Sequence, residues 1–345
     1  MGSDLPIVLY HYVFSPVARR VVWYLALRNI PYSQCYQPPI LPRPDIAQLG
    51  ISYRRIPLLS IGRDVYLDSR LIIRKLEELY PPSAAHPSIS ATTGDQKAIE
   101  RLLDFLMTDS GIFRNATQIL PTNLPAFKDP AFLKDRAELM GIVPGKTPPP
   151  QPTPAPNGKL RKPTAAAEVR DAMELLETTL LADGRNWLLK TDTPTLADIE
   201  AVWVFKWLTT MPGAFPADTI TTQQFPKVFA WMDRFSKVVD AKAKEYPVEK
   251  IKGDAAASKI LNAGYAEPEG GVEAEAVATV QGLKRGDVVS VYPTDSGFNH
   301  KEKGTLVGLN SKEVVIEVEG KNGKVRVHAP RHGFAVEKFV EKASL

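Results

Sequence analysis

The sequence predicts a multidomain protein with an α/β segment at residues 1–83, an all-helical segment at 90–255 and a small all-β segment at 271–345. Short apolar runs alternate with helical patterns in the first segment. Apolar residues recur at helical spacing in the second, and they alternate with polar residues in the third. A chain of 345 residues is long enough for two or three such domains.

The α/β segment has a compact order of elements. IVLYHYV predicts a strand, and Pro16 then favours the first turn of a helix. PYSQCYQ predicts a second strand, and IPLLSIGRDVYLD predicts a hairpin with its turn at Gly62. SRLIIRKLEELY predicts a helix that Asp68 or Ser69 caps. The resulting order, β-α-β-x-β-β-α, matches a thioredoxin-like domain.

The helical segment contains several amphipathic patterns and one clear start signal. Thr195 and Asp198 have the spacing of a capping box at the start of TLADIEAVWVFKWL. On that helix Ile199, Trp203 and Trp207 recur every four residues. We interpret this stripe first as core and second as part of a hydrophobic pocket.

Two further stretches lie around and beyond these helices. Residues 141–165 are rich in proline, so we expect an exposed loop or spacer there, with an SH3 or WW ligand as the alternative. After residue 271 the alternating runs are separated by turn signals such as Asn322-Gly323. Several short strands in so few residues predict a small SH3-like barrel.

Composition excludes several classes of protein. The net charge is only +4, without a basic block, so we expect no nucleic-acid partner. The sequence has no apolar run long enough to span a membrane, and its N-terminus does not resemble a secretory signal. The only cysteine, Cys35, falls in a predicted strand and is expected to be buried. We therefore expect a cytoplasmic protein.

Four motifs occur in a characteristic order: SPVARR after the first strand, RRIPLL before the hairpin, LDSRLI at the next helix and TPTLADI in the helical segment. Together they resemble the cytosolic glutathione transferases, which join a thioredoxin-like half to an all-helical half. The resemblance covers about residues 1–250 and is interrupted by the proline-rich insert. With an added C-terminal barrel, the chain looks like fungal-type proteins of this kind.

The resemblance implies how glutathione, the expected co-substrate, would be held before the hairpin. Ile56-Pro57 stands where the family has a cis-proline, and the Ile56 backbone would pair with the cysteine unit of glutathione. An ordinary edge-strand proline is the alternative. Arg55, or its neighbour Arg54, would reach the glycyl carboxylate, although two adjacent arginines also suit a solvated face.

The start of the next helix would hold the other end of glutathione. Free N–H groups at a helix N-terminus favour anions. By the same resemblance Ser69 would bind the γ-glutamyl carboxylate, and Asp68 would balance the ammonium group. A simple helix cap is the alternative, and the two roles are compatible.

Three hydroxyls stand near the break between the first strand and helix. A free thiol has a pKa of about 8.5, so it is mostly protonated at neutral pH, and a hydrogen bond donated to sulfur favours the thiolate. Ser15-Pro16 resembles the serine-type members of the family, which implies that Ser15 activates the thiol. Tyr12 or Tyr10 would do so in tyrosine-type members, but the spacing to Arg19 suits Ser15 better. Ser15 would also serve as an N-cap.

Two functions of different classes follow. The first is a glutathione transferase-like enzyme, or a glutathione-dependent isomerase or lyase, in which the thiolate attacks a small hydrophobic electrophile. The second is a non-catalytic scaffold or interaction module that uses the barrel and the proline-rich loop. The resemblance to this family, whose members commonly form dimers, implies a homodimer.

We expect no metal, because Pro330 separates His328 from His332 and argues against a helix that would present both.

Overall fold

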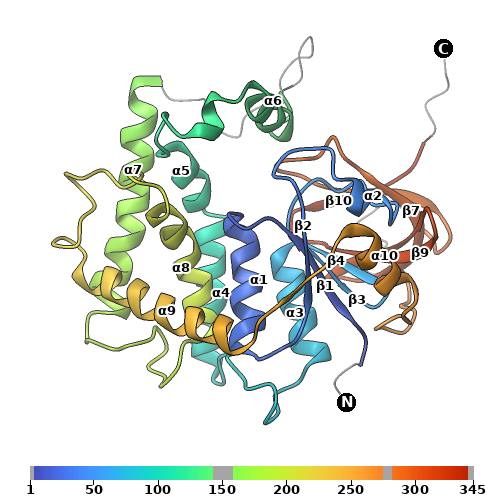
Figure 1. Ribbon diagram of the computed structural model, residues 1–345, viewed down its shortest axis with the longest axis horizontal. Coiled ribbons are helices and arrows are strands. Elements are labelled where there is room, and N and C mark those ends of the chain that lie inside the picture. The colour runs from blue at the N-terminus through green and yellow to red at the C-terminus, as the bar shows by residue number, and fades with distance from the viewer. Residues whose placement is uncertain (1–3, 143–157, 275–281, 341–345) are drawn as a thin grey trace.

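The computed structural model describes residues 4–142, 158–274 and 282–340. Helices α4 to α9 gather on one side of the molecule and the strands on the other, with α1 between them (Figure 1). The α-helices are α1 (Pro16–Leu27), α2 (Pro44–Ala47), α3 (Ser69–Leu79), α4 (Gly94–Thr108), α5 (Ile112–Gln118), α6 (Pro130–Leu139), α7 (Gly158–Leu175), α8 (Leu196–Thr209), α9 (Pro226–Glu245) and α10 (Gly253–Leu261). The strands are β1 (Ile7–His11), β2 (Ser33–Tyr36), β3 (Leu58–Ile61), β4 (Asp64–Leu67), β5 (Glu249–Lys250), β6 (Val288–Pro293), β7 (Glu302–Leu309), β8 (Glu313–Gly320), β9 (Gly323–Pro330) and β10 (Phe334–Lys338).

The N-terminal elements form the predicted thioredoxin-like arrangement. β1 pairs with β2 in parallel and with β3 in antiparallel orientation, and β3 and β4 form the predicted hairpin. The turn requires a positive φ at Gly62 (54°), a conformation that glycine adopts without steric cost. β1 is buried on both faces, because helices of the helical half cover one side and the other side packs against α2, α10 and side chains of the C-terminal strands.

The C-terminal strands continue this sheet. The described strands have the linear order β10-β6-β7-β8-β9-β4-β3-β1-β2-β5, in which β9 pairs in parallel with β4. The predicted strands are therefore present, with β6 to β9 as an antiparallel meander. This order does not confirm the closed SH3-like barrel; it shows a large mixed sheet shared with the N-terminal half.

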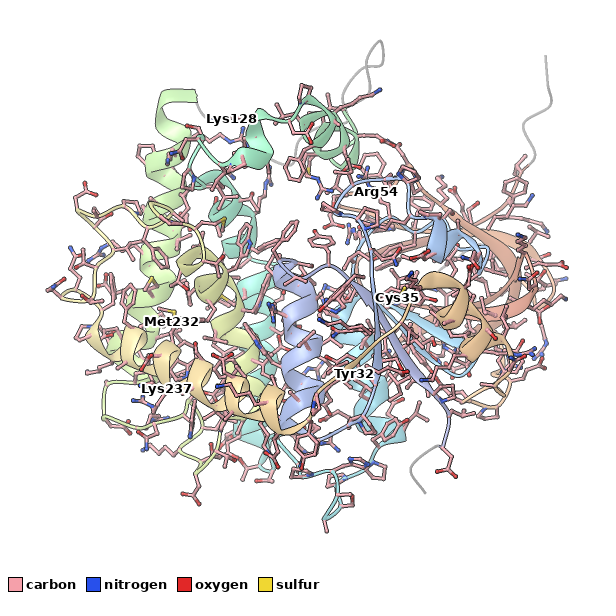
Figure 2. The ribbon with its side chains drawn as sticks, viewed as in Figure 1. Tyr32, Cys35, Arg54, Lys128, Met232 and Lys237 are labelled. Atoms are coloured by element: carbon pink, nitrogen blue, oxygen red, sulfur yellow. The ribbon has the colours of Figure 1, made fainter. Side chains whose placement is uncertain are left out.

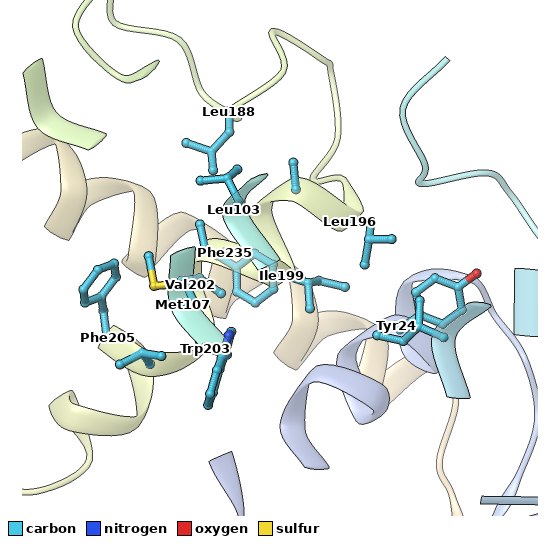
Figure 3. Close-up of a cluster of buried hydrophobic side chains, with 14 of the residues drawn as sticks. Tyr24, Leu103, Met107, Leu188, Leu196, Ile199, Val202, Trp203, Phe205 and Phe235 are labelled. Atoms are coloured by element: carbon cyan, nitrogen blue, oxygen red, sulfur yellow. The ribbon is translucent and has the colours of Figure 1, made fainter. Parts of the chain in front are cut away.

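Two hydrophobic clusters stabilise the molecule, one on each face of β1. Ile7 and Leu9 belong to the cluster that includes the helical half, whereas Val8 and Tyr10 belong to the cluster shared with α2, α10 and the C-terminal strands. Figure 3 shows part of the first cluster, where Trp203 of α8 packs among apolar side chains. This alternation follows from the period of two along a strand.

The end of the proline-rich stretch differs from the prediction. Residues 143–157 of the predicted 141–165 loop lie outside the described part of the chain, but α7 begins at Gly158 and contains Pro163. The prediction was wrong for 158–165: Pro163 lies inside α7 in spite of its missing backbone donor, and burial of Val169 and Met173 farther along the helix offsets that cost. Of the helices in the described ranges, none is long and apolar enough to cross a membrane.

Candidate functional site

Strand register brings the N-terminal candidate residues to one edge of the sheet. Tyr10 of β1 lies opposite Leu58 of β3, which in turn lies opposite Leu67 of β4. The residues after Tyr10, before Leu58 and after Leu67 therefore leave the sheet at the same edge, where α1 and α3 also begin. The candidates in these three connections are Tyr12, Ser15, Arg55, Ile56, Pro57, Asp68 and Ser69. Because helix N-termini carry partial positive charge, this edge favours a negatively charged ligand.

Ser15 is the N-cap of α1. Its hydroxyl oxygen accepts a hydrogen bond from the amide of Ala18 at 3.3 Å, and only 2% of the residue is exposed. Pro16 occupies the first helical position, which suits proline because no donor is lost there. The cap uses the acceptor capacity of the hydroxyl and leaves its proton available for donation. Tyr12 is half-buried, and its ring lies 4.9 Å from that of Phe14.

The Ile56–Pro57 bond is cis, as the sequence predicts. Both arginines before it are already engaged. Arg54 is buried and pairs with Asp135 of α6 at 2.9 Å. Figure 2 shows Arg54 on the loop near α6. Arg55 pairs with Asp295, from the β6–β7 connection. Arg55, the residue predicted to bind the glycyl carboxylate of glutathione, thus faces the C-terminal strands.

Asp68 and Ser69 begin α3. Asp68 adopts a positive φ of 69° and accepts the amide of Arg70 at 2.9 Å, as an N-cap does. Ser69 is buried, and its hydroxyl accepts a hydrogen bond of 2.9 Å from the guanidinium of Arg20 on α1. Burial lowers the pKa of the Arg55 guanidinium, but Tyr53 and the carboxylates of Asp295 and Asp68 raise it and prevail.

Arg20 connects the sheet-covering helices with the helical half. Its guanidinium pairs with Asp104 of α4 at 2.6 Å and with Glu200 of α8, and it lies 5.5 Å from the ring of Trp203. Burial raises the pKa of Glu200 to about 8, although Arg20 opposes this shift. The network therefore places a buried guanidinium, already paired with two acids, in hydrogen-bond contact with Ser69.

Thr195 and Asp198 lie elsewhere, in the scaffold. They form the capping box of α8, in which the Asp198 carboxylate accepts the Thr195 amide at 2.8 Å. The same carboxylate also accepts hydrogen bonds from the amide of Leu188 and the indole N–H of Trp231.

Cys35 is buried, and burial together with Asp45 raises its pKa to about 12, so this thiol is not a nucleophile at neutral pH.

A second polar cluster lies at the β4–β9 seam. Glu267, Glu313 and His328 have ligand atoms within 4.8 Å of one another, the spacing of a possible metal site. The ammonium of Lys75, however, already lies 2.6 Å from Glu267 and 3.0 Å from Glu313. This lysine supplies the positive charge that a metal would bring, so we interpret the cluster as an ion-pair network. His332 is exposed and bonds Asp109 instead.

Two groups of site residues were missed from sequence. Arg20 was visible in SPVARR, and its position four residues before the buried Tyr24 indicated the buried face of α1. Asp295 and Ser296 gave no signal, because contacts between residues 240 positions apart depend on how the C-terminal strands dock.

Comparisons with known proteins agree with this geometry. Residues 9–84 match the family model for the glutathione S-transferase N-terminal domain. This N-terminal part of the chain is therefore similar to that domain. Residues 115–244 match a domain of unknown function (DUF7962), and no curated protein matches the sequence significantly.

Solved structures show a similar fold over most of the chain. A GST-like protein from Pseudomonas syringae is 23% identical, with a TM-score of 0.63, and the match covers 98% of this chain and 100% of that one. The beta-etherase LigF from Sphingobium is 18% identical, with a TM-score of 0.51 and coverage of 70% and 100%. The Tau class glutathione S-transferase from mango is 16% identical, with a TM-score of 0.50 and coverage of 74% and 98%.

Proposed function

We propose that this chain binds glutathione at the sheet edge and activates its thiol for attack on a small hydrophobic electrophile. One observation carries the proposal: strand register collects Ser15, Pro57, Asp68 and Ser69 at the edge where α1 and α3 begin. The match of residues 9–84 to the glutathione S-transferase N-terminal domain supports it.

In this mechanism Ser15 lowers the pKa of the bound thiol. Its hydroxyl donates a hydrogen bond to the sulfur, and the N-terminus of α1 adds partial positive charge. A lowering by two units requires about 2.7 kcal/mol, which one hydrogen bond to an anion together with a helix terminus can supply. The thiol proton passes to solvent, and the thiolate forms a bond to the electrophilic carbon while a leaving group departs with its bonding electrons or the electrons of a conjugated double bond shift away from that carbon.

The remaining residues position glutathione. Ser69 binds the γ-glutamyl carboxylate with Arg20 behind it, and Asp68 balances the ammonium group. The Ile56 backbone pairs with the cysteine unit, and Arg55 reaches the glycyl carboxylate. Half-buried Trp207, whose ring lies 5.6 Å from that of Phe113, provides apolar surface for the electrophile.

Calorimetric titration of the full chain with glutathione tests the proposal. We expect a Kd below about 1 mM, with binding lost in Ser69→Ala. Ser15→Ala should keep most of the binding and lower the fraction of bound thiolate, which ultraviolet absorbance reports. Thr93→Ala is the matched control, because Thr93 caps α4 in the same way that Ser15 caps α1. Absence of binding at about 10 mM would contradict the proposal.

A non-catalytic scaffold is the second candidate. The engagement of Arg55 by Asp295 favours it, since a group proposed to bind ligand already has a partner within the chain. In that case the C-terminal strands would serve as an interaction surface. We also propose that the protein is a cytoplasmic homodimer, and sedimentation of the purified chain tests its assembly.

A further inference from the structure

The connection between β6 and β7 is seated against both arginines of the candidate site. The Gly297 amide donates to the carbonyl of Leu139 at 2.7 Å, and His300 bonds Glu138 of α6 at 2.7 Å. A Cβ atom at Gly297 would approach the Cγ of Arg54 to 3.1 Å. Glycine also suits the φ of 73° at this position. The loop is therefore fixed in contact with α6 and the segment before the cis-proline.

Within this contact, Arg55 makes two kinds of interaction. Its Nε and Nη2 atoms donate to the carbonyl oxygen of Ser296 at 2.9 and 2.6 Å. Nη2 also pairs with the carboxylate of Asp295. The Arg55 side chain is 20% exposed, whereas that of Asp295 is 72% exposed. The backbone carbonyl thus orients the guanidinium, and the exposed carboxylate is the partner that a ligand could displace.

We propose that Asp295 is a specificity-determining residue, which competes with the terminal carboxylate of a bound peptide thiol for Arg55. This inference rests on the proposed function. A ligand with a free carboxylate at this end must displace Asp295 or share the guanidinium with a second negative charge. A ligand with an uncharged end meets no such competition. Asp295 therefore reduces the advantage of a charged glycyl end and makes the site tolerant of thiols without one.

The test measures binding of two ligands by calorimetry. The ligands are glutathione and its glycyl ethyl ester, which lacks the terminal negative charge. The proteins are the full-length wild type, Asp295→Asn and Glu337→Gln. Glu337 is a matched control because it is a half-exposed acid of the same sheet, paired with Lys301 at 2.6 Å rather than with an arginine of the site.

We expect Asp295→Asn to bind glutathione about two- to fivefold more tightly, the range of a largely exposed ion pair, with unchanged affinity for the ester. Glu337→Gln should change neither affinity. Unchanged or weaker glutathione binding by Asp295→Asn, or equal tightening for both ligands, overturns the inference and leaves the proposed function standing. Failure of all three proteins to bind either ligand at about 10 mM overturns the proposed function and this inference together.

Discussion

The guanidinium of Arg20, on α1, donates a hydrogen bond of 2.9 Å to the hydroxyl of Ser69 at the start of α3. Through the same group, Arg20 pairs with Asp104 and Glu200 of the helical half. The residue proposed to bind a ligand carboxylate is therefore held by a buried charge that also joins the two halves. This arrangement couples the stability of the fold to the geometry of the site.

Replacing Arg20 with methionine should destabilise the protein by about 3–5 kcal/mol. The apolar side chain fills similar space but removes the buried donor that Ser69, Asp104 and Glu200 share. Denaturant unfolding measures the effect. The double variant Arg20→Met/Glu200→Gln should recover part of the loss, because glutamine replaces the buried acid with a neutral side chain that has its own donor. A single variant as stable as wild type would show that the network does not stabilise the fold. Arg170→Met is the control, since Arg170 forms an exposed pair with Glu174 on α7.

Asp198 should govern folding rather than chemistry. Its carboxylate accepts from the amides of Leu188 and Thr195 and from the indole of Trp231, and it is fully buried. We expect Asp198→Ala to lower the free energy of unfolding by at least about 3 kcal/mol, because several buried donors lose their acceptor. Asp198→Asn should lower the free energy of unfolding by less, since the amide oxygen of asparagine still accepts some of these hydrogen bonds.

Binding measurements separate the two roles of Asp198. If it acts only on the scaffold, the folded fraction of Asp198→Asn should bind glutathione with the wild-type Kd. A changed Kd at full folding would instead give this aspartate a direct influence on the site.

Local signals predicted much of the N-terminal half. Pro16 and Ser15 marked the start of α1, Gly62 marked the hairpin and Thr195 with Asp198 marked α8, because caps and turns depend on residues a few positions apart. The same signals indicated which residues stand at the ends of strands, and register then brought them together.

Long-range pairing was not predictable in the same way. Alternation predicted the strands after residue 271, but nothing in β9 indicates that Val327 pairs with Val65 of β4 rather than closing a separate barrel. Such pairing needs an edge strand with unpaired backbone N–H and C=O groups, and β4 becomes such an edge only once the N-terminal sheet has formed. The partners of Arg55 were missed for this reason.

The C-terminal strands should hold the segment before the cis-proline in place. Glu302, at the start of β7, is buried and accepts the amide of Ser52 at 2.7 Å, and the ring of Phe334 stacks on Tyr53. In Glu302→Ala this amide loses its acceptor, so we expect faster hydrogen exchange at residues 50–55 and weaker glutathione binding. Glu317→Ala is the control, because Glu317 pairs with Lys324 on the face of the sheet. Equal exchange in both variants would contradict the predicted role.

The seam between β4 and β9 should weaken as pH rises. His328 is buried and bonds the carboxylate of Asp64 at 2.9 Å, with Glu267 and Glu313 within 4.0 Å of its other nitrogen. Burial lowers the pKa of His328, but these carboxylates raise it and prevail. Because the folded-state pKa is higher than the ordinary value, the charged histidine contributes its full stability below that ordinary value. This contribution is lost as pH rises through the raised pKa.

Glu313 determines how the stability of this seam decreases at low pH. Burial raises the pKa of its carboxyl, but His328 and Lys75 lower it more strongly, to about 2. Its contribution is therefore present above the ordinary pKa of 4.5 and is lost as pH falls toward 2. Together the two groups predict that the seam is most stable in mildly acidic solution.

Comparison of wild type with His328→Gln isolates the histidine. Glutamine keeps a polar side chain at this position but cannot become charged. We expect the difference in free energy of unfolding between the two proteins to be larger at about pH 6 than at about pH 9, because the stability that the charged histidine contributes decreases once pH exceeds its ordinary pKa of 6.5. His332→Gln is the control, since His332 is exposed and lies outside the seam. A difference between wild type and His328→Gln that does not vary with pH would show that His328 stays neutral in the folded protein.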